Sequence, residues 1–74
     1  MISEHDRVVL TVGLPDIGLA AGDIGTVVHV YPDGRAFEVE FVALDGETVA
    51  VATLTSQQIR HVAPKEIAHA RSVA

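Results

Sequence analysis

The sequence contains no cysteine, so neither a disulfide bridge nor a thiolate metal site can support the fold. It also lacks tryptophan, and its only other aromatic residues are Tyr31, Phe37 and Phe41. A chain of 74 residues holds one domain, because a fold of this size buries only about 60 % of its unfolded surface and cannot divide its core. Stability must therefore come from the packing of aliphatic side chains, with or without a partner subunit.

Positive charge is scarce. Five Lys and Arg residues face ten Asp and Glu residues, which gives a net charge of -5 at pH 7. The resulting field repels phosphate backbones and anionic lipid headgroups, so nucleic acid and membrane are poor partners. No apolar run reaches the roughly 20 residues that span a bilayer. The first residues, MISEHDR, lack the basic and apolar stretches of a signal peptide, and we expect a cytoplasmic protein.

Aliphatic and β-branched residues dominate what is present, since 49% of the chain is hydrophobic. Such a composition favours strands. A loop rich in Gly and Pro is expected at residues 13–23, and a short helical turn at 55–58. The expected strands are the runs 7–12, 24–31, 36–42, 48–54 and 59–62.

The clearest local signal is a hairpin formed by runs 24–31 and 36–42, which the sequence Pro-Asp-Gly-Arg at 32–35 separates. Proline fixes φ at the first corner, and Asp-Gly supplies the positive φ values of a tight turn. Apolar and acidic residues alternate in the second run, which predicts one face in the core and one in water. The inward residues are Phe37, Val39 and Phe41, and the outward ones are Glu38 and Glu40.

These signals predict an all-β fold for residues 1–63, a small, partly open SH3-like barrel of about five antiparallel strands with a short helical turn before the last strand. Residues 64–74 form a C-terminal tail with only Ile67 and Ala70 as an apolar stripe. Helices this short rarely persist alone in water. We expect the tail to be frayed, a short helix, or docked on another surface.

The segment GDIGTVVHVYPDGRAFEVEFVALDGETVAVATL, residues 22–54, resembles the short bacterial proteins grouped as domain-of-unknown-function family 4926. The resemblance extends from about Val8 to Val62. It departs from the family's pattern at Phe37, where tyrosine is frequent, and at Ala43, where an acidic residue is common. The matching residues are Gly22, Asp23, Gly25, Thr26, Val27, Val28, Val30, Tyr31, Gly34, Glu38, Val39, Glu40, Phe41, Gly46, Leu54 and Val62.

This resemblance implies a small SH3-like β-barrel, similar in appearance to the barrel of the nitrile hydratase β chain. It implies no established activity. Members of such families can lie beside toxin-like genes, which suggests an antitoxin or immunity-type partner by analogy alone.

Catalytic and metal-binding patterns are missing from the sequence. The serines lie near the ends or in a turn, without a G-x-S-x-G context, and the histidines lack the close spacing of a metal site. We therefore expect no catalytic residue, no metal ligand and no cofactor, and a protein that is not an enzyme. The serines and histidines of the chain are Ser3, Ser56, Ser72, His5, His29, His61 and His69.

Five carboxylates lie within fifteen residues and predict an acidic face: Asp33, Glu38, Glu40, Asp45 and Glu47. One interpretation is a solvated sheet face that keeps a small protein soluble and discourages edge pairing. The other is a docking surface for a basic partner, whose approach the charge would steer.

The leading functional hypothesis is a small non-enzymatic binding module that engages a protein partner or a second copy of itself. The contact could use a sheet edge, the loop after Gly13 or the acidic face. A Val-rich edge strand at 48–54 would be a template for a homodimer. The alternatives are a nucleic-acid-contacting barrel and an accessory subunit of an enzyme complex. A further alternative is an accessory or catalytic role tied to a metal.

Overall fold

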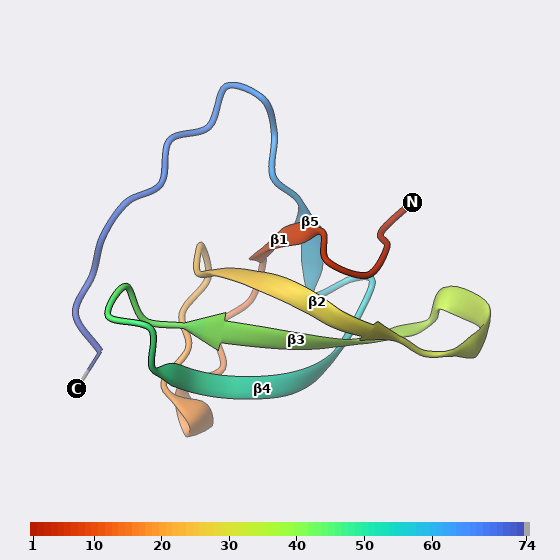
Figure 1. The fold of residues 1–74 in the computed structure, drawn as a ribbon, viewed down its shortest axis with the longest axis horizontal. Helices are drawn as coiled ribbons and strands as arrows, with labels where there is room; N and C mark the ends of the chain where they lie inside the picture. Colours follow the sequence, from red (N-terminus) through yellow and green to blue (C-terminus); the bar gives the residue numbers. More distant parts are fainter. Residues whose placement is uncertain (74) are drawn as a thin grey trace.

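The alternating apolar residues form five strands in the computed structural model, which describes residues 1–73. Two single-turn 3-10 segments interrupt the loops (Figure 1). The elements are β1 (Arg7–Leu10), η1 (Pro15–Ile17), β2 (Ile24–Val30), η2 (Pro32–Gly34), β3 (Ala36–Val42), β4 (Thr48–Thr55) and β5 (Ile59–His61). All pairings are antiparallel, in the order β4-β3-β2-β1-β5, so the predicted all-β class is confirmed.

The predicted hairpin is the centre of this sheet. β2 pairs with β3 through η2, in which Asp33 (φ 74°) and Gly34 (φ 62°) both adopt left-handed backbone angles. Asp tolerates this region better than most residues, and Gly enters it without steric cost. The Pro-Asp-Gly sequence therefore supplies the turn that the strands require.

The sheet curls because its two end strands are consecutive in the chain. β4 pairs with β3 and β5 pairs with β1, although only residues 56–58 separate β4 from β5. In that connection the Gln58 N–H donates to the Thr55 carbonyl at 3.0 Å, which is the expected single helical turn. The Thr11 N–H then donates to the Gln58 carbonyl at 2.8 Å. This order and connectivity are those of the predicted partly open barrel.

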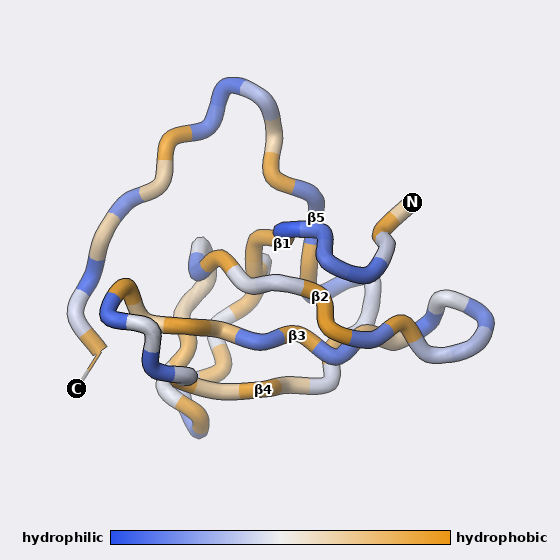
Figure 2. Tube along the Cα trace, in the orientation of Figure 1, coloured by the Kyte–Doolittle hydropathy of each residue, from blue (hydrophilic) through white to orange (hydrophobic). Residues whose placement is uncertain are grey.

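The core lies inside the curl and draws on all five strands. The apolar residues of β3 alternate with its carboxylates, as Figure 2 shows along the trace. One core residue, Leu19, comes from the loop between β1 and β2. The core consists of Val8, Leu10, Leu19, Val27, Phe37, Val39, Phe41, Ala52, Leu54 and Ile59.

A β-bulge in β2 changes which residues face the solvent. The register with β3 shifts between Val27 and His29, and Val28 and His29 are both exposed as a result. A bulge adds one unpaired residue and bends its strand. The bulge therefore helps β2 to follow the curl of the sheet.

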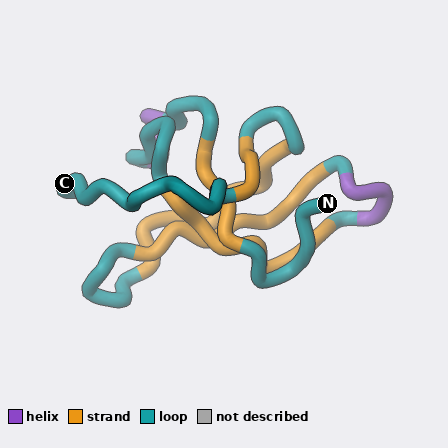
Figure 3. The backbone as a smooth tube through the Cα atoms, turned by 90° about the horizontal axis from the view of Figure 1, so that it is seen from above, coloured by secondary structure: helices purple, strands orange, loops and turns teal. Residues whose placement is uncertain are grey.

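The segment after β5, residues 62–73 and hereafter the tail, contains no helix or strand. It arches away from β5 and returns to the opposite side of the molecule (Figure 1). Seen from above, it crosses over the strands (Figure 3). Residues 62–73 therefore run back along the barrel without forming a helix.

Across residues 1–73, no helix has the length and apolar character needed to cross a bilayer.

Candidate functional site

The five residues of the predicted acidic face do not gather into one cluster. Glu38 and Glu40 lie on the outer side of β3, and Asp33 lies in η2 at one end of that strand. Asp45 and Glu47 lie in the turn that follows the other end of β3. The two turns are at opposite ends of the hairpin in Figure 1. The carboxylates are therefore strung along the whole length of β3.

Hydroxyl groups hold the two central carboxylates against the sheet. Glu38 Oε1 accepts hydrogen bonds from the Thr53 hydroxyl at 2.6 Å and the Tyr31 hydroxyl at 3.2 Å. Glu40 Oε2 accepts one from the Thr48 hydroxyl at 2.8 Å. In each of these two carboxylates the hydrogen bonds engage one of the two oxygens. The solvated sheet face and the docking surface for a basic partner both stay predictions.

The aspartates of the two turns have conformational roles. Asp45 Oδ1 accepts a hydrogen bond from the Glu47 N–H at 3.0 Å, and Gly46 follows with a φ of 96°. This local hydrogen bond is typical of an aspartate that closes a turn. Asp33 provides the left-handed residue of η2.

The edge of the sheet at β4 exposes backbone hydrogen-bonding groups, and the hydrogen bonds of β3 fix which ones. The Tyr31 N–H donates to the Ala36 carbonyl at 3.0 Å, so Ala36 directs its backbone groups toward β2. Backbone groups alternate in direction along a strand, and Val39 therefore directs its own toward β4. Val39 is opposite Ala52 in the ladder. The backbone groups of Ala52 thus point back toward β3.

Val51 and Thr53 flank Ala52 and direct their N–H and C=O groups away from β3. Among residues 1–73, neither residue hydrogen-bonds to the backbone of a loop, turn or terminus. β4 is an end strand of the sheet (Figure 1), and Val51 is 51% exposed. The second half of β4 therefore presents donors and acceptors that another strand can pair with.

The composition of β4 does nothing to block such pairing. Natural edge strands are usually protected by charged residues, by proline or by short length. β4 has eight residues, TVAVATLT, with neither a charge nor a proline. This edge combines high β-propensity with free backbone groups.

Two bidentate ion pairs fix the tail to the barrel. The first joins Arg60 of β5 to Glu66, with N–O distances of 2.8 and 2.6 Å. Glu66 Oε1 also accepts the Ala63 N–H at 2.7 Å. The Arg60 guanidinium, helped by this amide, lowers the pKa of Glu66 to about 2. The start of the tail is thereby turned back toward the barrel.

The second ion pair joins Arg71 to Asp23 across the molecule. Arg71 Nε lies 2.7 Å from Asp23 Oδ1, and the guanidinium also donates to the Gly18 carbonyl at 2.9 Å. Asp23 Oδ2 also accepts a hydrogen bond from the Ala20 N–H at 2.8 Å, which orients the carboxylate independently of Arg71. Hydrogen bonding to Arg71 lowers the pKa of Asp23 and raises that of Arg71.

Sequence reasoning missed this contact, because it placed Asp23 at the end of the loop 13–23 and gave it no partner. The partners are 48 positions apart, and no local pattern links them.

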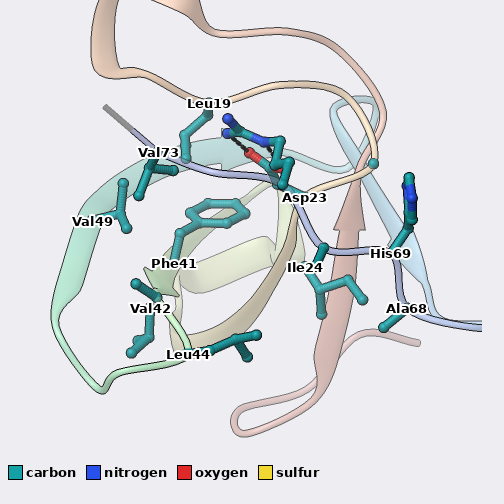
Figure 4. A pocket seen from close by; sticks show the side chains of 14 residues that line it. Leu19, Asp23, Ile24, Phe41, Val42, Leu44, Val49, Ala68, His69 and Val73 are labelled. Atoms are coloured by element: carbon teal, nitrogen blue, oxygen red, sulfur yellow. Dashed lines mark hydrogen bonds and ion pairs between the residues drawn. The ribbon is translucent and has the colours of Figure 1, made fainter.

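A cleft of about 400 Å³ lies between the tail and the barrel beside this ion pair. In Figure 4 the ring of Phe41 lies at its centre, with the aliphatic side chains of the barrel around it. The tail closes one side. The lining includes Leu19, Asp23, Ile24, Phe41, Val42, Leu44, Val49, Ala68, Ala70, Arg71 and Val73.

The histidines occupy separate parts of the surface. His29 Nδ1 is 3.9 Å from Glu4 Oε2, and His61 Nε2 is 3.4 Å from Asp6 Oδ2. Within the described residues, no group of three His, Asp or Glu side chains is placed to hold a metal ion.

No curated protein and no solved structure matches the chain. A family match, by contrast, covers residues 4–61, which include all five strands and end with β5. The tail lies outside the matched region. The chain belongs to the family described as a domain of unknown function (DUF4926).

Proposed function

We propose that the protein is a small non-enzymatic binding module of the bacterial cytoplasm that recruits another polypeptide strand to the open edge of β4. In the isolated protein the strand is β4 of a second copy. The observation that carries this proposal is the outward direction of the Val51 and Thr53 backbone groups on an uncharged edge.

Pairing of two β4 edges gives an isologous contact, in which the same surface of each copy meets across a two-fold axis. Main-chain hydrogen bonds supply the affinity in such strand addition, and exposed side chains supply the selectivity. Val51 would lie at the seam on the outer face. The two sheets would then form one continuous sheet.

The acidic residues do not prevent this contact. Glu40 is opposite Val51 in the ladder and therefore lies one strand in from the edge. In an edge-to-edge dimer the two copies of Glu40 would be separated by three strand spacings, roughly 14 Å. The Debye length is only about 8 Å at physiological ionic strength, so their repulsion is largely screened. Added salt should strengthen the dimer slightly.

The charge distribution supports a protein partner over nucleic acid. Two of the five cationic side chains, Arg60 and Arg71, are held in bidentate pairs with the protein's own carboxylates. They contribute little to a phosphate-binding surface. The cellular role of the module, as an antitoxin or immunity-type partner or an accessory subunit, follows only from family analogy.

Sedimentation velocity over a concentration series tests the proposal. The wild type should form a dimer as concentration rises, and Val51→Pro should remain monomeric because it removes one outward N–H. Val51→Thr keeps that N–H and a β-branched side chain, and should dimerise like the wild type. Circular dichroism checks that each variant is folded.

A wild-type protein that stays monomeric throughout the series, or a Val51→Pro variant that dimerises normally, would overturn the edge contact. Amide exchange gives an independent measurement. The N–H groups of Val51 and Thr53 should become protected at concentrations where the dimer forms.

A further inference from the structure

We propose that Asp23, the Gly18 carbonyl and the adjoining cleft form a second binding site, distinct from the β4 edge. Its ligand is an extended segment of another protein in which an arginine is followed two positions later by an aliphatic residue. The protein's own tail occupies this site in cis through Arg71 and Val73. The site neither requires nor excludes the proposed strand pairing.

The polar half of the site is built to hold a guanidinium. Both oxygens of Asp23 accept from Arg71, and the Gly18 carbonyl accepts a further N–H of the same group. The Asp23 side chain is only 17% exposed and is oriented by the Ala20 N–H. A planar fork of donors matches this set of acceptors, whereas a lysine offers a single point charge.

The apolar half of the site is the surface that contacts the aliphatic residue of the ligand, the position that Val73 occupies in the tail. Val73 lines the same cleft as Arg71, on the C-terminal side of the ion pair. Figure 4 shows Val73 near Leu19 and Val49, with the Phe41 ring beside them. The spacing of arginine and aliphatic residue is therefore set by the distance between Asp23 and this apolar surface.

The tail fills the site incompletely. It presents the small residues Ala68 and Ala70 to a cleft of about 400 Å³. Across the cleft, Ile24 and Val42 remain 37% and 46% exposed. A segment with a larger apolar residue in place of Ala70 would cover more of this surface. Such a segment can displace the tail.

Release of the tail leaves the barrel intact. Every residue of the hydrophobic core lies between Val8 and Ile59, and the family match also ends before the tail. A tethered ligand nevertheless competes at an effective concentration on the order of millimolar. The tail is therefore an intramolecular competitor that sets a threshold for the external ligand.

The test uses the full-length Arg71→Ala variant, in which the site is vacated without truncation. An acetylated peptide with the sequence of residues 66–73, EIAHARSV, is titrated into it by calorimetry. Saturable binding is expected, and the wild type should bind the same peptide about tenfold more weakly because its tail competes. A peptide with leucine at the position of Ala70 should bind more tightly, and one with lysine for arginine at least about tenfold more weakly.

A matched pair of double variants locates the site. Asp23→Asn combined with Arg71→Ala should lose the peptide, whereas Asp16→Asn combined with Arg71→Ala should retain it, because Asp16 is an exposed acid of the same loop. Val51→Pro combined with Arg71→Ala should also retain it, which separates this site from the β4 edge.

Failure of the folded Arg71→Ala variant to bind the peptide would overturn the proposal, and so would equal binding of a peptide with alanine in place of arginine. A wild-type dimer that Arg71→Ala abolishes would also overturn it, since the site would then hold the tail of a second copy.

Discussion

Gly25 of β2 lies so close to Val39 of β3 that a methyl group on its Cα would come within 2.6 Å of Val39 Cγ1. The same methyl group would lie 2.9 Å from the Phe41 ring and 3.0 Å from the Glu40 carbonyl. The backbone of β2 therefore packs directly on side chains of its neighbour. The φ of Gly25 is not in the left-handed region, so backbone conformation does not explain the glycine. Lack of space for a side chain does.

Gly25→Ala should destabilise the protein by about 1–3 kcal/mol, the usual cost of inserting a methyl group into a packed core. Urea denaturation would measure the change in free energy of unfolding. Gly13→Ala is the matched control, since nothing lies within 4 Å of the added methyl group and the backbone there is not left-handed. Equal stability of the two variants would contradict the close packing.

Leu54→Ala should destabilise the protein by about 2–5 kcal/mol, because it opens a cavity at a side chain that is only 2% exposed. For so small a domain this loss can approach the whole free energy of unfolding. Thermal denaturation by circular dichroism is the measurement. Leu44→Ala makes the same chemical change at a side chain that is 99% exposed, and its unfolding should match the wild type.

The carboxyl group of Glu66 should titrate with a pKa of about 2, because Arg60 and the Ala63 N–H stabilise its charged form. A lowered pKa in the folded state means that the contribution to stability is present above the unfolded value of 4.5. It is lost as the pH falls from there toward 2. Carboxyl carbon shifts in an NMR titration would report the pKa.

Arg60→Gln provides the control for that titration. It removes the Arg60 guanidinium, which is the larger cause of the lowered pKa, and keeps the hydrogen bond from the Ala63 N–H. The pKa of Glu66 should move back toward 4.5 in this variant. A pKa that does not respond would show that the ion pair does not form in solution.

The protein should not retard a DNA duplex or an RNA hairpin in a gel-shift titration at low salt. Its net charge is -5, and phosphate contacts need unpaired cations. A shifted band that weakens as salt rises would instead support the nucleic-acid alternative.

Replacement of Glu38, Glu40 and Glu47 by alanine should leave concentration-dependent dimerisation intact, because the edge contact uses backbone groups of β4. Sedimentation of this triple variant beside the wild type is the measurement. Loss of the dimer would show that the interface is at the acidic face. The carboxylates would then be a docking surface and not only a solvated sheet face.

The strands and the hairpin could be predicted because their signals are local. The alternation from Phe37 to Phe41 defines a buried and a solvated face, and the Pro-Asp-Gly turn of η2 fixes the partner strand. Both depend on residues that are neighbours in sequence. The bulge at Val28 was not predicted, because no residue near it in the sequence marks the shift in register.

The candidate site could not be predicted in the same way. The acidic residues are close in sequence, but β3 separates Asp33 from Asp45 by the length of a strand. Arg71 and Asp23 are far apart in sequence and meet only because the tail returns across the barrel. Because the acidic residues are close in sequence, their closeness in space was overestimated. Because Arg71 and Asp23 are far apart in sequence, their contact was not predicted.

The course of the tail also decides how the protein should be immobilised for partner searches. Val73 lines the cleft, so an affinity tag attached on the C-terminal side of Val73 would be close to the Asp23 site and would compete for its space. The N-terminus lies on another side of the barrel, as Figure 1 shows. A tag at the N-terminus leaves the cleft accessible.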